Sequence, residues 1–296
     1  MARAGHAIGV GNGRRLRWAP FAALAALVLT GALLKSIPGD AWRGRFGDER
    51  PFAAAIARGT LVVAVPSQPA PILYVGKVDR SVRAPESYSA SLAGDLGRRV
   101  GLPVKLLLSD PAQARKAVQS GEADVAIAGL ALSPDESIAF APTSYSSGRG
   151  VALVLRGGNV QTQSDMRGRA VCASRESPYA SRAAFELGAT LQSFDRPLDA
   201  LLAFQAGECA ALIDDEYVIR SLLKQPDWAY YRALPGSFEA APAFIAVRGK
   251  DAASAVYVEH VVDDWRRQRW LTSVREDRAT QLAFEMFNAE NDLYCH

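Results

Sequence analysis

The stretch at residues 117–127, AVQSGEADVAI, recurs in altered form at residues 203–213, AFQAGECAALI, with five identities in eleven positions. Each copy has the pattern of a helix end, a glycine that can adopt positive φ as a helix C-cap, and a buried strand. Five identities could arise by chance in an alanine-rich chain, so the repeat alone does not establish duplication. The pattern nevertheless favours two lobes of similar α/β architecture.

Short apolar runs alternate with amphipathic helical stretches on both sides of the first copy, which is typical of parallel sheets with helical crossovers. We predict a strand at 61–65, a helix at 91–100 that ends at Gly101, and a strand at 104–108. Further strands are predicted at 124–128, 151–155, 170–173, 191–194, 211–213 and 244–247. A last amphipathic helix is predicted at 252–270, and residues 280–296 are expected to pack back on a lobe.

Open parallel sheets bind ligands beyond the carboxyl ends of their strands. In this chain those ends are residues 66–68, 129–133, 174–177 and 214–216. We therefore expect these four segments to line one crevice.

The N-terminus carries an export signal. Arg14, Arg15 and Arg17 precede an apolar run at 19–34, the order found in signal peptides and N-terminal anchors. We interpret residues 1–37 as a signal peptide or N-terminal membrane anchor and residues 38–49 as a polar linker. The rest of the chain is then expected outside the cytoplasm, with tethering to the inner membrane as one alternative.

Export places the three cysteines, Cys172, Cys209 and Cys295, in an oxidising compartment where disulfides persist. Cys172 lies in an apolar strand-like run and is most simply a buried small hydrophobe. Cys209 and Cys295 flank more polar sequence, so a bond between them is one alternative.

Composition excludes some classes of partner. The formal net charge is only +3, and part of it belongs to the N-terminal arginines, so no basic surface for a nucleic acid is indicated. His6, His260 and His296 are scattered, and no cysteine or histidine spacing predicts a metal site. We expect no metal and no cofactor.

Several short motifs in fixed order resemble the periplasmic solute-binding proteins for polar amino acids, which deliver ligands to ABC importers. The motifs are GEADVAIAG (121–129), LSPDE (132–136), FAPTSYSSG (140–148), DMRGRAV (165–171) and AGECAALIDD (206–215). The resemblance covers residues 59–270. It implies a two-lobed α/β fold in which each lobe is an open, mainly parallel sheet with flanking helices.

The resemblance also implies a domain layout and partners. Lobe 1 would comprise residues 50–148 plus 244–296, and lobe 2 residues 149–243. Two crossover strands, near 148–154 and 242–247, would form the hinge about which the lobes close on a small molecule. A partner permease and a periplasmic location follow from the same likeness.

Proteins of this family grip an amino acid by its two charges. The aspartate that accepts the ammonium group corresponds to Asp215, although an aspartate at a strand-to-helix turn is also an ordinary helix N-cap. The carboxylate-binding arginine corresponds to Glu136, and its accompanying threonine to Ala131. Neither residue suits a carboxylate, so the resemblance predicts a first-lobe site altered from the family pattern.

Other candidate ligand-binding residues lie after predicted strands or near the first-lobe wall. Arg175, Glu176 and Ser177 precede a predicted helix whose N-terminus could attract an anion, although Arg175 could equally be a solvated surface residue. Tyr88 and Ser67 could line the first-lobe wall.

We weigh three functions from the sequence. The first, which the sequence favours, is a protein that binds a small polar solute for delivery to an importer, with Asp215 as ammonium acceptor and no catalysis. The second is a tethered sensor or accessory protein with a degenerate cleft. The third is a dehydratase-like enzyme on the same fold, with Glu176 or Glu136 as general acid. No nucleophile and base pair, metal cluster or phosphate loop accompanies these carboxylates, so we do not expect an enzyme.

Overall fold

The computed structural model describes residues 50–70 and 82–294. The predicted signal or anchor and the linker lie outside the described residues, as does Cys295. The helices are α2 (Ala53–Arg58), α3 (Ser87–Val100), α4 (Pro111–Ser120), α5 (Ala180–Leu187), α6 (Pro197–Gln205), α7 (Glu216–Leu222), α8 (Ala252–Arg267) and α9 (Trp270–Tyr294), with short 3₁₀ turns at Gln163–Met166 and Pro226–Trp228. The strands are β1 (Leu61–Pro69), β2 (Arg83–Pro85), β3 (Val104–Ser109), β4 (Val125–Leu130), β5 (Ile138–Phe140), β6 (Arg149–Leu155), β7 (Ala170–Ser174), β8 (Thr190–Phe194), β9 (Ala211–Asp215), β10 (Tyr231–Ala233), β11 (Phe238–Glu239) and β12 (Phe244–Arg248).

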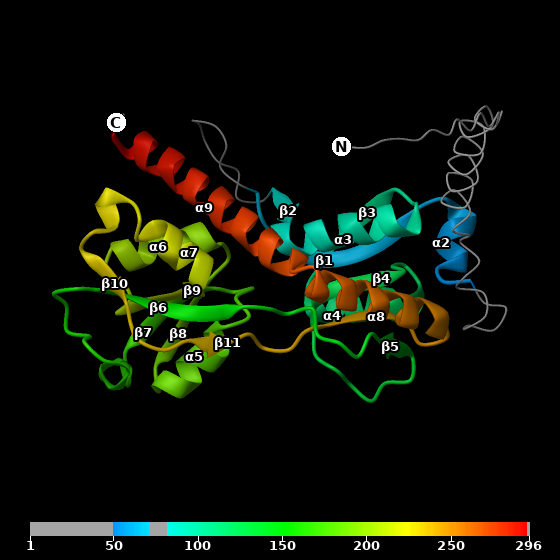
Figure 1. Ribbon diagram of the computed structural model, residues 1–296, viewed down its shortest axis with the longest axis horizontal. Coiled ribbons are helices and arrows are strands. Elements are labelled where there is room, and N and C mark those ends of the chain that lie inside the picture. The colour runs from blue at the N-terminus through cyan, green and yellow to red at the C-terminus, as the bar shows by residue number, and fades with distance from the viewer. Residues whose placement is uncertain (1–49, 71–81, 295–296) are drawn as a thin grey trace, which may run out of the picture. The chain divides into compact units, whose positions relative to one another are not determined.

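The strands form two sheets, each with flanking helices (Figure 1). The first has the order β2-β1-β4-β12-β5, with β3 also paired to β1, and the second has the order β10-β6-β9-β7-β8, with β11 paired to β6. Each keeps a parallel centre, β3-β1-β4 and β8-β7-β9, and adds antiparallel strands. The predicted two-lobed α/β class is confirmed.

Both sheets are buried on two faces, as alternate side chains show. In the first, Val63 and Val125 belong to one apolar cluster, whereas their neighbours Ala64 and Ala126 belong to another. Successive residues of a strand point to opposite faces, so helices must cover both sides of the sheet. The second sheet repeats this alternation, with Leu212 in one cluster and its neighbours Ala211 and Ile213 in another.

The sequence repeat has the predicted structure. Gly121 and Gly207 each have φ of 81°, and each lies between a helix and a buried strand. An L-residue with a side chain is strained at this φ, which explains the glycine in both copies.

Each predicted strand is present, whereas two predicted helices have different bounds. The helix expected at 91–100 begins earlier, at Ser87, because the Glu86 carboxylate caps it by accepting from the backbone N–H of Tyr88 and Ser89. The helix expected at 252–270 ends at Arg267. A turn with Arg269 at φ 56° then separates it from α9.

Two segments connect the lobes, residues 141–148 and 240–243. They run side by side: the Ala141 N–H donates to the Ile245 carbonyl at 2.9 Å, and the Tyr145 N–H donates to the Ala243 carbonyl at 3.0 Å. Each lies just before the crossover expected from the resemblance: most of 148–154 belongs to β6, and most of 242–247 belongs to β12.

The cysteine pairing differs from our expectation. Cys172, predicted to be a buried small hydrophobe, is buried but forms a disulfide with Cys209, with Cα atoms 5.6 Å apart. Cys172 lies in β7, and Cys209 lies just before β9, the parallel neighbour of β7. Because adjacent strands bring the two positions together, Cys209 is not available to Cys295.

Helix α9 packs on both lobes, whereas we had assigned residues 244–296 to lobe 1. Leu271, near its start, belongs to the main core of lobe 1. Ala279, Leu282 and Met286, further along, belong to a core cluster of lobe 2. In Figure 1 this helix passes from the first sheet to the second. It therefore joins the lobes in addition to the two crossovers.

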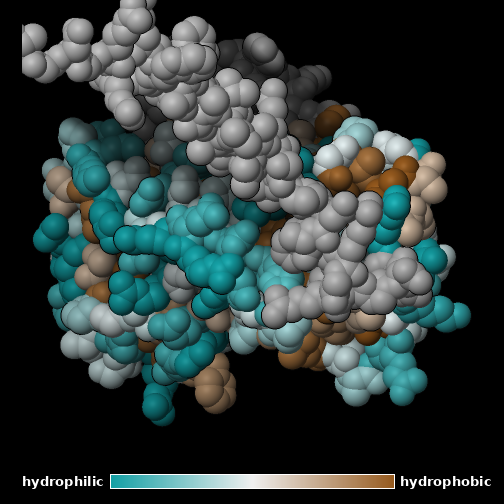
Figure 2. All heavy atoms as spheres, turned by 45° about the vertical axis from the view of Figure 1, so that its right-hand side comes forward, coloured by the Kyte–Doolittle hydropathy of each residue, from teal (hydrophilic) through white to brown (hydrophobic). Residues whose placement is uncertain are grey.

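Hydrophilic residues cover most of the described surface on the face in Figure 2, with smaller hydrophobic patches between them. Among the described residues, no helix is long and apolar enough to cross a membrane.

The packing of α9 can be tested by truncating one buried and one exposed side chain of the same helix. Leu282→Ala should lower the free energy of unfolding by about 2–4 kcal/mol, because Leu282 is buried against lobe 2. Phe284→Ala, at a position 59% exposed, should change it by less than about 0.5 kcal/mol. Urea denaturation measures both, and equal effects would contradict this packing.

Candidate ligand-binding cleft

A cavity of about 90 Å³ lies between the lobes, at the strand ends singled out from the sequence. Each of the four ends contributes a residue to its wall: Pro66, Gly129, Glu176 and Asp215. The remaining wall is formed by Glu86, Tyr88, Ser89, Tyr145, Ser146, Ser147, Pro178, Tyr179, Ala243, Arg275 and Arg278. The sheet topology thus brings together segments that lie far apart in sequence.

Asp215 ends β9 and is buried, with 3% of its surface exposed. Its carboxylate accepts a hydrogen bond from the Tyr217 N–H at 2.9 Å, which caps α7. It also accepts from the Tyr179 hydroxyl at 2.6 Å. Asp215 is therefore a helix N-cap that also faces the cavity, and its role as an acceptor for a ligand's ammonium group stays a prediction.

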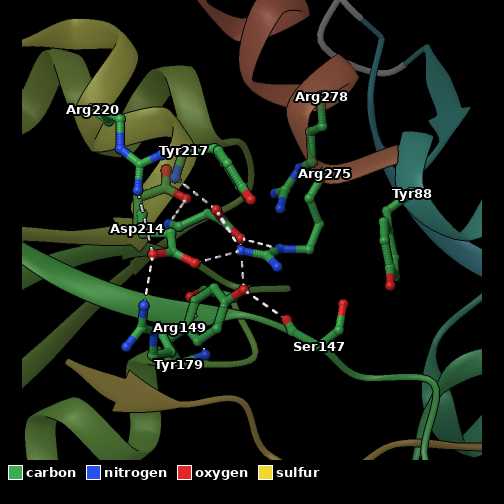
Figure 3. Close-up of polar contacts among 12 residues, drawn as sticks. Tyr88, Ser147, Arg149, Tyr179, Asp214, Tyr217, Arg220, Arg275 and Arg278 are labelled. Carbon is green, nitrogen blue, oxygen red and sulfur yellow. Dashed lines mark hydrogen bonds and ion pairs between the residues drawn. The ribbon is translucent and has the colours of Figure 1, made fainter. Parts of the chain in front are cut away.

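The cationic partner of Asp215 comes from the chain itself. The Arg275 guanidinium, on α9, donates from Nε to Asp215 Oδ2 at 2.7 Å and from Nη2 to Oδ1 at 3.1 Å. Arg275 is only 7% exposed, so the two-pronged pair is buried. Figure 3 shows Arg275 reaching from α9 toward Tyr179 and Tyr217.

Two further contacts fit the guanidinium. Its central carbon lies 4.9 Å from the centre of the Tyr217 ring, within the range of a cation–π interaction. A β-carbon placed on Gly148 would lie about 2 Å from the guanidinium atoms. The absence of a side chain at this crossover residue therefore makes room for Arg275.

The electrostatics keep this site charged and hydrogen-bonded. Burial lowers the pKa of Arg275, but the hydrogen bonds and charge of Asp215 outweigh it, so the pKa is raised. Burial and the neighbouring Asp215 charge raise the pKa of Tyr179, which therefore stays a neutral donor to Asp215.

Only some of the predicted site residues face this cavity. Glu176 and Tyr88 do so together with Asp215. Burial raises the pKa of Glu176, and the nearby Glu86 charge adds to the effect. Burial likewise raises the pKa of Tyr88 to about 12, and its hydroxyl donates to the Tyr145 carbonyl at 3.2 Å.

Five predicted residues do not line this cavity. Arg175 is mostly exposed and pairs with Asp195 at 2.8 Å, while the Ser177 N–H donates to the Ser174 carbonyl. The Ser67 carbonyl and hydroxyl accept from Arg83.

The other two are the altered first-lobe positions. Ala131 is exposed. Glu136 is also exposed, and its backbone lies beside Gly249, beyond the end of β12 that points away from the crossover. Neither side chain reaches the cavity, so the first-lobe contribution to the site comes from α3 and the crossover.

Sequence reasoning missed three charged cavity residues, Glu86, Arg275 and Arg278. Glu86 precedes a predicted helix and could have been found as its cap. The two arginines lie beyond the resemblance, and no local pattern indicates that α9 crosses the cleft.

Among the described residues, no group of three or more histidine, cysteine or carboxylate side chains is arranged to hold a metal ion. The cavity polar groups are carboxylates, guanidinium groups and hydroxyls, which suit a small organic ligand or water.

Comparison with known proteins finds solved structures with the same fold as this chain. An amino acid ABC transporter substrate-binding protein from Streptococcus pneumoniae, bound to L-arginine, aligns with a TM-score of 0.54 at 21% identity, covering 77% of this chain and 98% of that one. An ancestral amino-acid-binding protein described as a precursor of cyclohexadienyl dehydratase aligns with a TM-score of 0.53 at 18% identity, covering 76% and 97%. The chain has the fold of a two-lobed substrate-binding protein.

A third similar structure of this fold, an ancestral arginine-binding protein bound to arginine, has a TM-score of 0.51 at 21% identity and covers 74% of this chain and 98% of its own. No protein-family model matches the sequence, and no curated protein matches it. At these identities the likeness concerns the fold alone.

A pH-dependent stability follows from Asp214, the neighbour of Asp215. Burial raises its pKa to about 6, so the native state binds an extra proton between about pH 4 and pH 6. This contribution to stability is present below about pH 4 and is lost as the pH rises through 6. The loss for a shift of about two pH units is on the order of 3 kcal/mol.

Asp214→Asn should remove this dependence while keeping an acceptor for the Asp215 N–H, which Asp214 binds at 2.7 Å. Urea denaturation from pH 4 to pH 7.5 should show the variant becoming progressively more stable than the wild type as the pH rises. A constant difference across this range would contradict the assignment.

Proposed function

We propose that this protein is an exported binding module with an internally occupied cleft, acting as a sensor or accessory subunit rather than as a carrier of free amino acids. The observation behind this proposal is the buried pair between Arg275 and Asp215. Asp215 is the residue that the resemblance assigns to a ligand's ammonium group, and the chain's own guanidinium already holds both of its oxygens.

A free cation would have to displace Arg275 before Asp215 could bind it. Removing one member of a buried ion pair costs about 3–5 kcal/mol, because the other charge is left unpaired. A ligand that had to overcome this cost would bind about 100- to 5,000-fold more weakly than at a vacant site. Such a penalty disfavours capture of amino acids at low concentration.

Helix α9 also opposes the hinge motion that a carrier needs. Leu282 and Met286 are buried on lobe 2, while Leu271 is buried on lobe 1. Opening the cleft would expose one of these sets, and each large apolar side chain contributes about 1.5–3 kcal/mol on burial. The buried pair between Arg196 and Glu285, 2.7 Å apart, further attaches α9 to lobe 2.

The size of the cavity supports the same conclusion. An engineered protein cavity that binds benzene has a volume of about 150 Å³. The cavity here, about 90 Å³, is smaller, so a free amino acid with a long side chain would exceed its volume.

Export is supported by two independent features. The basic and apolar N-terminal segment has the pattern of an export signal. The disulfide between Cys172 and Cys209 suits an oxidising compartment. We accordingly place the folded region outside the cytoplasm, tethered if residues 1–37 are retained.

Delivery of a solute to an ABC importer is the alternative function. It is supported by the fold, and it requires that α9 leave the cleft so that Asp215 can receive a ligand. Neighbouring genes for a permease and an ATPase would favour it.

A dehydratase-like enzyme is a second alternative, supported by Glu176. Its carboxyl lines the cavity with a raised pKa, as a general acid would. Turnover of a carboxylic acid that disappears in Glu176→Gln would establish this activity. Glu136, the other carboxylate considered, is exposed and outside the cavity.

Chemical rescue tests whether Arg275 occupies the cation site. Wild-type protein should show no rise in melting temperature with L-amino acids, amines or methylguanidine at 5 mM. Arg275→Ala should lose stability and regain part of it with methylguanidine, because the small cation can occupy the vacated position beside Asp215. Differential scanning calorimetry measures both effects, and Arg275→Met, which removes the cation but keeps more of the side-chain bulk, serves if the alanine variant does not fold.

The matched control is Arg220→Ala, which removes a mostly exposed guanidinium 5.2 Å from the same Tyr217 ring but leaves Asp215 paired. It should show no rescue, and Arg275→Ala with Asp215→Asn should show none. If an amino acid stabilises the wild type and Asp215→Asn abolishes the effect, the proposal fails and the carrier function is correct.

A further inference from the structure

The cavity contains a second arginine whose hydrogen-bonding capacity is unused. Arg278 lies on α9 one turn beyond Arg275, and both project toward the cleft in Figure 3. Its nearest carboxylate is Glu86, with Nε 3.8 Å from Oε1, which is too long for a hydrogen bond. Within the described part of the chain, its guanidinium makes no hydrogen bond.

Glu86 cannot readily approach closer, because its two oxygens already hold the start of α3. Oε1 accepts from the Tyr88 N–H at 2.9 Å, and Oε2 accepts from the Ser89 N–H at 2.8 Å. Asp215 is likewise committed to Arg275 and Tyr179. A guanidinium group has five N–H donors in a planar fork, so Arg278 presents several of them with no acceptor.

A second polar group in the cavity wall also lacks a partner. The Ser147 hydroxyl is buried next to the Tyr88 side chain, and no hydrogen bond of good geometry satisfies it within the described part of the chain. Buried polar groups are normally hydrogen-bonded, and each that is not costs about 1–3 kcal/mol. Ser147 is such a buried group, and Arg278, whose side chain is 19% exposed, adds unused donors to the same cavity, so together they favour a polar guest.

The chemistry of these donors selects the guest. A planar guanidinium binds a carboxylate through two parallel hydrogen bonds. The cavity is about three-fifths of the volume that holds the six carbons of benzene, so the guest has about four or five non-hydrogen atoms.

We propose that the cavity binds a small carboxylate of the size of acetate or glycolate, with the carboxylate on Arg278 and a hydrogen bond from Ser147. This inference rests on the proposed function, because Arg275 must remain on Asp215 for the cavity to have this size and charge. Arg278 thereby restores, from the C-terminal helix, the carboxylate contact that Glu136 and Ala131 do not provide.

Glu176 makes the binding pH-dependent. Its carboxyl lines the cavity without an ion-pair partner among the described residues, and burial together with the Glu86 charge raises its pKa. A protonated Glu176 can donate a hydrogen bond to the guest, whereas an ionised one repels it. The charges that act on this carboxyl are those of Glu86, Arg175, Arg278 and Arg83, and Arg275 and Asp215 also line the cavity. Affinity should therefore rise as the pH falls through the pKa of Glu176.

Isothermal titration calorimetry of the full-length protein in detergent, with sodium acetate and with sodium chloride at equal ionic strength, tests the inference. Acetate and glycolate should bind saturably, whereas benzoate and chloride should not. Arg278→Ala should weaken acetate binding at least tenfold, and Ser147→Ala several-fold, while Arg182→Ala, at an exposed position on α5, should leave it unchanged. Affinity for acetate should be greater at pH 5 than at pH 7.5, and Glu176→Gln should flatten this dependence.

Absence of acetate binding beyond the chloride control, equal binding by Arg278→Ala, or a crystal structure grown in acetate that shows only water in the cavity would overturn the inference. Arg278→Lys covers the case in which the alanine variant does not fold, and it should weaken binding by losing the planar fork. These outcomes leave the proposed function untouched, since that depends on amino acids failing to bind at Asp215.

Discussion

The cleft depends on the ion pair between Arg275 and Asp215. Both side chains are buried, and a buried pair is tolerated only if its hydrogen bonds are satisfied. The Tyr179 hydroxyl and the Tyr217 N–H also donate hydrogen bonds to the Asp215 carboxylate. Gly148, which has no side chain, leaves space for the Arg275 guanidinium. The pair fixes α9 across the cleft and determines which charges face the remaining cavity.

This arrangement separates the fold from the function usual for it. The two sheets, two crossovers and shared strand ends form the two-lobed framework, and they place Asp215, which the resemblance assigns to a ligand's cation, in the cavity wall. A helix from the same chain then supplies that cation and joins the lobes. The other residues of the cavity wall would then determine which ligand binds. Among them is Arg278, whose guanidinium has no hydrogen-bonded partner among the described residues.

Local patterns predicted much of this structure. The apolar runs located the strands, Gly121 and Gly207 marked the helix-to-strand turns, and the strand ends, including 214–216, located the cavity. Contacts between segments far apart in the sequence could not be predicted from local patterns. The apolar residues of α9 do not form one stripe, because its first turns pack on lobe 1 and later turns on lobe 2. The Cys172–Cys209 bond likewise depends on the pairing of β7 with β9, which spacing alone does not reveal.

A double-mutant cycle between Arg275→Met and Asp215→Asn tests the central claim most directly. Urea denaturation of the wild type, both single variants and the double variant gives the coupling free energy between the two side chains. The structure predicts a coupling of about 1.5–3 kcal/mol, so the double variant should be destabilised by less than the sum of the two single variants. A coupling near zero would show that Arg275 does not occupy the cation site and would contradict the account.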